Sequence, residues 1–289
     1  MKNPIFILGC SRTGSKMFMK IINDYSTINI TPELNFLAPF WIRQDFITKV
    51  KKNIKDLKKD SNITKLIDLI YSGKLEGSFW KSIKNRNLDK KILEKKIMKS
   101  DRSFESIFKI ILEEHVKSKD KIIPGAKFPV HFSYIYKLFE WYPNCKIVFL
   151  IRDPRAIYAS LAVGFIKKSR SKYLTTLIRT IICIYTIFQF IWAVNIHKKY
   201  MHQRNYCLFR FEDIISNPEK CIANLCCFLE IEFKSDMLNP SVVGSSYHKN
   251  KKRGFDTETL YRWKKHISPI TDNLMKIIIS KQMKETGYL

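Results

Sequence analysis

The chain has 289 residues, 45% of them hydrophobic, so it can bury a substantial core and is not a disordered tail. Its formal net charge is +26, from 52 Lys and Arg against 26 Asp and Glu. This charge predicts attraction to polyanions, anionic lipid surfaces or anionic small molecules. The abundance of Lys, Ile and Asn beside only nine glycines is typical of an AT-rich genome, so we attribute most of the charge to composition.

The seven cysteines form no Cys-x-x-Cys pair, and their odd number and wide spread do not indicate a disulfide framework. We expect reduced core thiols in a cytoplasmic protein. The six histidines are also scattered, and His197 and His202 lack a partner at metal-ligand spacing, so no metal site is predicted. Because a strand is predicted almost at the first residue, we expect neither a signal peptide nor an N-terminal anchor.

The first stretch of the chain predicts a strand, a tight loop and a helix. Residues 4–8 are an apolar run of β-formers, Gly14 closes the loop, and an amphipathic segment follows from Met17. The first turn of a helix offers unpaired N–H groups and the positive end of a dipole. Since Arg12 adds a fixed charge, this loop is predicted to bind an anion.

A second extended segment is predicted at residues 29–33, ending at Pro32. Glu33 then emerges from a strand end, beside the opening loop if the two strands are neighbours in the sheet. Ligands of α/β sheets collect at the carboxyl ends of strands, so this carboxylate is a candidate general base. An ordinary surface glutamate after a proline is the alternative.

A helical insertion is expected at about residues 40–118. Within it, residues 49–99 carry sixteen basic against six acidic residues in short helical fragments, a pattern typical of a solvated basic surface. Phe79 and Trp80 are candidates for lining a substrate cleft. After the insertion, Lys127 lies in a short segment with two prolines, whose rigidity suits it to positioning a charge.

The second strong signal is the apolar run 146–151, which is typical of a strand buried in a parallel sheet. Arg152 follows at its carboxyl end, and Pro154 suits the first turn of a helix with Asp153 as its N-cap. Ser160 lies two turns into that helix and is predicted to face the same crevice. A structural ion pair for the arginine and an ordinary helix position for the serine are the alternatives.

Residues 180–196 contain no charge, which is marginal for a membrane span because about 20 mainly apolar residues are needed. We interpret this run as a long core helix, with a membrane-facing role as the alternative. A third strand is predicted at 206–213 and an amphipathic helix at 218–229. The basic stretch 249–254 then predicts either a phosphate clamp or an exposed loop.

Together these stretches resemble the sulfotransferases that use 3′-phosphoadenosine 5′-phosphosulfate (PAPS), in the branch with Golgi-type, tyrosylprotein and bacterial members. The resemblance covers most of the chain. It implies a single domain over residues 1–289 with a P-loop-like, three-layer α/β fold, in which helices flank a central, mostly parallel sheet. It also implies PAPS as the donor, adenosine 3′,5′-bisphosphate (PAP) as the product, and no metal.

The resemblance assigns the donor site residue by residue. The loop after the first strand holds the 5′-phosphosulfate in the family, and here it comprises Ser11, Arg12, Thr13, Gly14, Ser15 and Lys16. The strand that ends in Arg-Asp-Pro-Arg, with a serine eight residues after the first arginine, holds the 3′-phosphate, which implies this role for Arg152 and Ser160. Lys252 and Arg253 resemble the family's Arg-Lys-Gly phosphate clamp.

Two further positions match the tyrosylprotein branch. Glu33 follows Arg12 by twenty-one residues, like the glutamate that activates the acceptor, and Lys127 is the counterpart of a site lysine. The resemblance implies that Glu33 removes the acceptor's proton while Arg12 and Lys127 stabilise developing charge. Lys16 departs from the family's Thr or Ser, and Ser11 from its proline.

Two other functions fit parts of the sequence. A P-loop kinase or NTPase would use the Gly-x-x-x-x-Gly pattern from Gly9, but the order Ser15-Lys16 reverses the Walker motif's Lys-Ser/Thr. A non-catalytic protein that binds nucleic acid or a membrane surface would use the charge alone, although no nucleic-acid motif supports it. For a sulfotransferase, the acceptor hydroxyl belongs to a saccharide, a glycolipid or another molecule, and peripheral membrane contact is compatible with a lipid-linked one.

Overall fold

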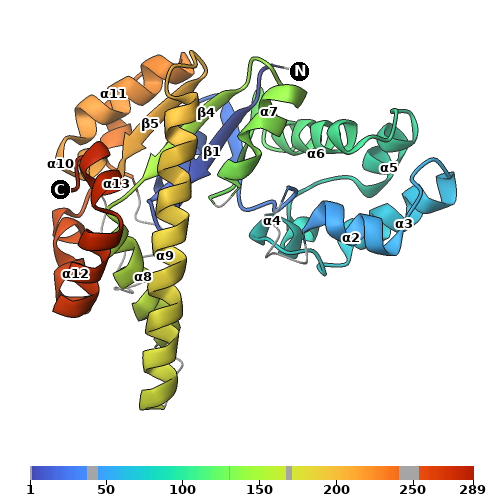
Figure 1. Ribbon diagram of the computed structural model, residues 1–289. Coiled ribbons are helices and arrows are strands. Elements are labelled where there is room, and N and C mark those ends of the chain that lie inside the picture. The colour runs from blue at the N-terminus through green and yellow to red at the C-terminus, as the bar shows by residue number, and fades with distance from the viewer. Residues whose placement is uncertain (1, 38–44, 130, 167–170, 241–253) are drawn as a thin grey trace. The chain divides into compact units, whose positions relative to one another are not determined.

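A computed structural model describes residues 2–37, 45–129, 131–166, 171–240 and 254–289 (Figure 1). Its centre is one five-stranded parallel sheet in the order β2-β3-β1-β4-β5. The strands are β1 (Ile5–Gly9), β2 (Ile28–Thr31), β3 (Ile123–Lys127), β4 (Lys146–Ile151) and β5 (Tyr206–Arg210). The predicted α/β fold with a parallel sheet and flanking helices is thereby confirmed.

Helices follow or separate the strands throughout the described chain. The α-helices are α1 (Ser15–Tyr25), α2 (Phe46–Asn53), α3 (Asp60–Tyr71), α4 (Ser78–Lys81), α5 (Lys90–Met98), α6 (Phe104–Lys117), α7 (Ile135–Trp141), α8 (Pro154–Ile166), α9 (Lys172–Tyr200), α10 (Phe211–Ser216), α11 (Pro218–Leu229), α12 (Pro269–Ile278) and α13 (Ser280–Glu285). Short 3₁₀ turns are η1 (Ile83–Asn85), η2 (Phe132–Tyr134), η3 (Ser235–Leu238), η4 (Thr257–Leu260) and η5 (Arg262–His266).

Strand β3 was not predicted, and it changes the expected order of the sheet. It contains Pro124 and Gly125, both weak strand formers. Its register pairs Gly125 with Ile5 on β1 and with Ile30 on β2. A side chain at Gly125 would lie 2.4 Å from the Ile5 carbonyl oxygen, so this close approach requires glycine. Strands β1 and β2 are therefore separated by the strand that carries Lys127.

The chain divides into two compact units, Met1–Leu8 with Ile22–Ile147 and Gly9–Ile21 with Val148–Leu289. The core of the first unit is aromatic. Phe36 lies between Phe46 and Phe108, with ring centroids 4.3 Å and 4.7 Å away, and Phe108 also stacks on Phe6 of β1. Helices α2 and α6 thus pack on the core of this unit through large apolar rings.

In the second unit, α8 packs against α9, the long helix that is yellow in Figure 1. The helix runs beyond the predicted 180–196 at both ends. Its stretch Tyr173–Tyr200 has the length and apolar composition of a membrane span, and 44% of its most apolar window is buried against the protein. One face of α9 therefore packs into the core of the second unit.

Candidate active site

The loop from β1 to α1 has the tight geometry predicted for an anion site. Gly9 has a φ of 125°, and a side chain there would lie 1.9 Å from the Leu150 carbonyl oxygen. Arg12 adopts the left-handed region with a φ of 64°, and the Thr13 hydroxyl donates to the Cys10 carbonyl at 2.9 Å. These contacts fold the loop tightly ahead of the first turn of α1, where helix N–H groups favour an anion.

Two predicted donor-binding residues meet directly. Arg12 Nε donates to Ser160 Oγ at 3.0 Å, although 148 residues separate them. Ser160 is buried in the second turn of α8, whereas Arg12 is exposed. The hydroxyl therefore orients a guanidinium whose remaining N–H groups can serve a phosphate or sulfate.

Arg152 is held at the end of β4 by contacts on several sides. Its Nη1 donates to the Arg12 carbonyl at 3.0 Å and its Nη2 to the Thr259 carbonyl at 3.3 Å. Its guanidinium carbon lies 4.1 Å from the centroid of the Phe211 ring. A side chain at Gly14 would lie 2.9 Å from the same ring, so loop, arginine and phenylalanine form one packed cluster.

The loop has one further partner that the sequence analysis missed. Gln189 of α9 accepts from the Ser11 N–H at 3.2 Å and donates to the Tyr185 hydroxyl at 2.7 Å. In the sequence, Gln189 is only a polar residue inside an apolar helix. A buried polar side chain needs a hydrogen-bond partner. A glutamine in an otherwise apolar helix therefore indicates a specific contact, and this is the signal that could have identified Gln189.

Residues at the start of α1 differ in exposure. Ser15 is buried and Lys16 is exposed. A cation in the first turn opposes the helix dipole by about 0.3–1 kcal/mol, so Lys16 is better suited to contacting an anion than to stabilising the free helix.

Cys10 at the other end of the loop is fully buried, and burial raises the pKa of its thiol to about 12, which makes it a poor nucleophile.

The first unit holds the other predicted pair. Lys127 Nζ lies 2.8 Å from Glu33 Oε1, where β3 and the segment after β2 run side by side. The lysine side chain is 1% exposed and the glutamate 39%. The lysine is therefore fixed inside the protein, while the carboxylate remains open to solvent.

The helical insertion positions Glu33 through its backbone. The Phe79 N–H donates to the Glu33 carbonyl at 3.0 Å, and the Trp80 indole N–H donates to the Leu34 carbonyl. A side chain at Gly77 would lie 2.4 Å from that same Glu33 carbonyl oxygen. Phe79 and Trp80 are both fully buried, so the prediction that they line a cleft is wrong. They hold the glutamate's segment instead.

Lys252 and Arg253, the residues expected to clamp a phosphate, lie outside the described residues. Gly254, which follows them, donates its N–H to the Pro240 carbonyl at 2.9 Å and has a φ of 84°. Within the described ranges, no group of three His, Cys, Asp or Glu side chains has the geometry of a metal site.

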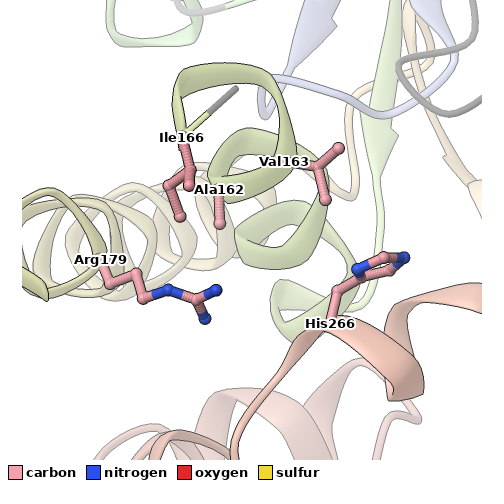
Figure 2. Close-up of a pocket in the computed structure, with 5 residues that line it drawn as sticks. All are labelled: Ala162, Val163, Ile166, Arg179 and His266. Carbon is pink, nitrogen blue, oxygen red and sulfur yellow. The ribbon is translucent and has the colours of Figure 1, made fainter. Parts of the chain in front are cut away.

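A cavity of about 240 Å³ lies in the second unit beside α8, the helix that carries Ser160 (Figure 2). Its apolar wall is Ala162, Val163 and Ile166 of α8, and Arg179 and His266 project toward it. It is lined by none of the predicted site residues.

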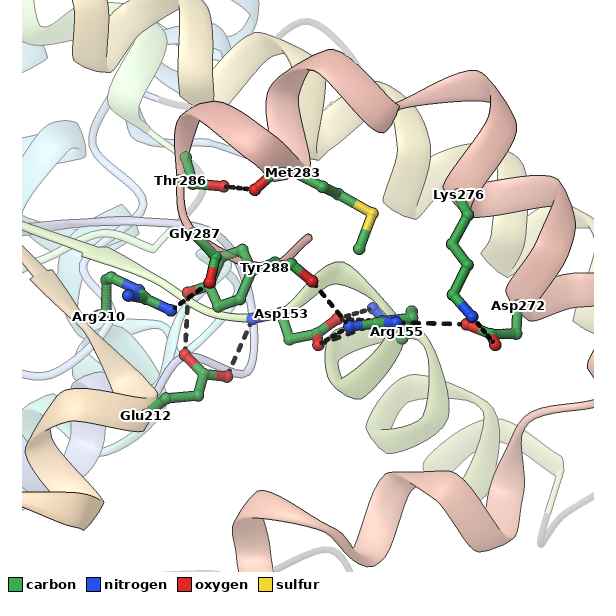
Figure 3. Close-up of polar contacts among 10 residues, drawn as sticks. All are labelled: Asp153, Arg155, Arg210, Glu212, Asp272, Lys276, Met283, Thr286, Gly287 and Tyr288. Atoms are coloured by element: carbon green, nitrogen blue, oxygen red, sulfur yellow. Dashed lines mark hydrogen bonds and ion pairs between the residues drawn. The ribbon is translucent and has the colours of Figure 1, made fainter.

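A polar network supports the junction that carries Arg152 (Figure 3). Arg155 pairs with Asp153 at 2.7 Å and with Asp272 at 3.5 Å, and it donates to the Tyr288 carbonyl at 3.1 Å. Glu212 accepts from the Asp153 N–H at 3.0 Å and from the Tyr288 hydroxyl at 2.9 Å. Burial raises the pKa of Glu212. The C-terminal segment, which no motif singled out, thus fixes the strand end.

Comparison with known proteins identifies a family and several structures with the same fold. The model of the sulfotransferase family matches residues 4–235. A search of curated protein sequences finds no significant match.

Several solved structures share the fold. A sulfotransferase domain from the curacin biosynthetic pathway superposes with a TM-score of 0.62 at 15% identity, covering 100% of this chain and 99% of that one. The sulfotransferase domain of the Synechococcus PCC 7002 olefin synthase gives 0.57 at 16% identity, covering 96% and 95%. A mouse sulfotransferase complexed with PAP gives 0.52 at 9% identity, covering 99% and 86%.

Proposed function

Because the chain belongs to the sulfotransferase family, we propose that it transfers a sulfuryl group from PAPS to an acceptor hydroxyl and releases PAP. The observation that carries this proposal is the cluster of Arg12, Ser160 and Arg152 around the loop after β1. Two oriented guanidinium groups, a hydroxyl and a helix N-terminus suit a ligand with two separate anionic groups. A kinase would need a metal-binding aspartate where Arg152 ends β4, so this alternative is not favoured.

We assign the 3′-phosphate to Arg152 and Ser160. The 5′-phosphosulfate is assigned to the loop of Ser11, Arg12, Thr13, Gly14, Ser15 and Lys16. Lys252 and Arg253 complete the set as the family resemblance implies. These residues fit PAPS because their charged side chains are cationic. Their hydroxyl and backbone N–H groups are the kinds that donate hydrogen bonds to phosphate oxygens. Bound PAPS supplies an activated sulfuryl group that is joined to a good phosphate leaving group.

Glu33 is the general base in this proposal. It accepts the acceptor's proton as the hydroxyl oxygen bonds to sulfur and the bond from sulfur to the bridging phosphate oxygen breaks. The buried Lys127 orients the glutamate, and its ammonium also offers charge to the transferred group. Arg12 stabilises negative charge on the leaving phosphate.

For the acceptor, we favour a hydroxyl of a saccharide or glycolipid, since basic and aromatic residues suit an anionic sugar. A lipid-linked acceptor would bring the protein to the periphery of a membrane. We place the protein in the cytoplasm of a bacterium, where its free cysteines would stay reduced. Cell fractionation with an antibody tests this location.

The decisive experiment incubates the protein with ³⁵S-labelled PAPS and separate saccharide, lipid and peptide fractions of a cell extract. Label in one fraction, together with release of PAP, is the expected result. Calorimetric titration with PAP and with Mg-ATP runs in parallel. Tight Mg-ATP binding without PAP binding would contradict the proposal.

A further inference from the structure

Helix α9 carries a row of exposed apolar side chains along one side. Leu174, Leu177, Ile181, Ile184 and Phe188 are between 48% and 72% exposed. The opposite side of the helix is buried, through Ile182, Cys183, Thr186, Ile187, Phe190, Ala193 and Val194. The exposed row is therefore not needed for the core of its own unit, and it spans about 21 Å at the rise of an α-helix.

The spacing of the row is that of a helix–helix seam. Its steps along the chain are three, four, three and four residues, which place the row at the a and d positions of a heptad. The next two positions of the pattern are Ile191, which is half-buried, and Asn195, which is exposed. An asparagine at an a position is a known device for fixing the register and number of paired helices.

The residues that flank the seam are uncharged. The e and g positions are Tyr173, Ile178, Thr180, Tyr185 and Trp192, together with Ile187 and Val194, which already face the core. Arg179 occupies the far side of the helix, where it points toward the cavity with His266 (Figure 2). Two copies of this face can therefore meet without like charges opposite one another, despite the net charge of +26.

The same arrangement disfavours a membrane as the occupant. An interfacial helix normally places Lys and Arg beside its apolar face, and none flanks this row between Tyr173 and Val194. A spanning helix would have to leave the core, which would expose the buried Gln189 and break its contacts with Ser11 and Tyr185.

We propose that the chain forms a homodimer in which α9 of one copy pairs with α9 of a second copy through this seam. Five large side chains that are each about half exposed supply roughly 100 Å² apiece, and the flanking residues add more, which approaches the roughly 800 Å² per partner of a stable interface. This inference does not rest on the proposed function, because it concerns the exposed face of α9, a helix that carries none of the assigned site residues.

Sedimentation equilibrium of the purified full chain tests the proposal. The wild-type protein is expected to be a dimer at micromolar concentration. Ile181→Glu with Ile184→Glu places charges at adjacent a and d positions of both helices and is expected to weaken association at least about a hundredfold. Asn195→Ile is expected to shift the equilibrium in the opposite direction, toward tighter or larger assemblies.

The matched control replaces Ile270 and Ile277 of α12 by Glu, since they are also exposed apolar residues of the second unit. This variant is expected to remain dimeric. If the double Glu variant misfolds by circular dichroism, Leu177→Gln with Phe188→Gln replaces it. A monomeric wild type, dimers that survive the seam substitutions, or a monomer that sediments with phosphatidylglycerol vesicles through these same residues would overturn the proposal.

Discussion

Glu33 and Lys127 form an ion pair of 2.8 Å across 94 residues of sequence, with the lysine buried and the glutamate 39% exposed. The asymmetry has a chemical consequence. The buried ammonium of Lys127 is held in place by the surrounding protein, so it fixes the position of the Glu33 carboxylate. The carboxylate is still accessible to a reactant because it is partly exposed. This geometry is compatible with the proposed role of Glu33 as a general base beside a fixed cation.

Glu33→Ala is expected to abolish sulfuryl transfer while PAP binding stays within about threefold of wild type. The reason is that Glu33 is the base in the proposed mechanism, whereas the proposed donor-binding residues belong to the loop after β1, the end of β4 and the helix that follows it. Radiolabel transfer and calorimetry with PAP measure the two effects separately. Glu140→Gln, at an exposed glutamate of the same unit, is the control. Full turnover by Glu33→Ala would remove this residue from the mechanism.

The same substitution should also reduce stability, because it leaves the buried Lys127 without this carboxylate. Breaking a fully buried pair costs about 3–5 kcal/mol, and the exposure of Glu33 reduces this to about 1–3 kcal/mol. Lys127→Met in the Glu33→Ala background should recover part of the loss, since it removes the buried charge. Urea unfolding measures both. An additive double variant would show that the two residues are not coupled.

Arg152→Lys is expected to weaken PAP binding about 10- to 150-fold, because in the proposed site its guanidinium makes charge-assisted hydrogen bonds to the phosphate, worth about 1.5–3 kcal/mol, that an ammonium cannot reproduce as a fork. Ser160→Ala should cost less, about 3- to 10-fold, since only one uncharged hydroxyl is removed from the proposed 3′-phosphate site and from the side of Arg12. Arg86→Lys is the matched control, because Arg86 likewise stacks on a phenylalanine but in the other unit. Equal losses in all three variants would point to general destabilisation.

Lys16→Thr is expected to change stability and binding in opposite directions. Removing a cation from the first turn of α1 should stabilise the free protein by about 0.3–1 kcal/mol, because the charge no longer opposes the helix dipole. PAP binding should weaken and depend less steeply on salt, since one charge contact is lost. Thermal unfolding and calorimetry at two salt concentrations provide the test, with the exposed Lys234→Thr as control. Unchanged salt dependence would exclude contact between Lys16 and the anion.

Stability is expected to fall as the pH decreases below about 6.5. Burial lowers the pKa of His115 and of His131 to about 3, whereas an unfolded histidine has a pKa of about 6.5. Between these two pH values the unfolded chain binds more protons than the folded one. The free energy of unfolding therefore keeps the full contribution of the neutral histidines above about pH 6.5 and loses it progressively toward pH 3. Each histidine contributes at most about 1.4 kcal/mol per pH unit.

His131→Phe tests this dependence. Its ring packs on Phe128 at 5.1 Å between centroids, and neither ring nitrogen has a hydrogen-bond partner in the described structure. The substitution should therefore preserve stability at pH 7.5 and reduce the loss between pH 6.5 and 5, as measured by urea unfolding. If this variant loses as much unfolding free energy between pH 6.5 and 5 as the wild type, His131 does not contribute to the pH dependence.

Much of the donor site could be predicted from sequence because its determinants are local. The apolar runs of β1 and β4, the glycines of the first loop and the Arg-Asp-Pro-Arg stretch each specify their own backbone. The interpretation of Arg12, Arg152 and Ser160 as neighbours also required the family resemblance, and the structure brings these three together. Their binding roles remain predictions.

Other features were decided by tertiary structure. Strand β3 forms in spite of Pro124 and Gly125, because buried neighbours on both sides supply its hydrogen bonds and leave room only for glycine. Gln189 reaches Ser11 across 178 residues, and Tyr288 reaches Glu212 across 76. Local propensity cannot specify such contacts, since they arise only when distant buried polar groups must satisfy one another in the folded chain.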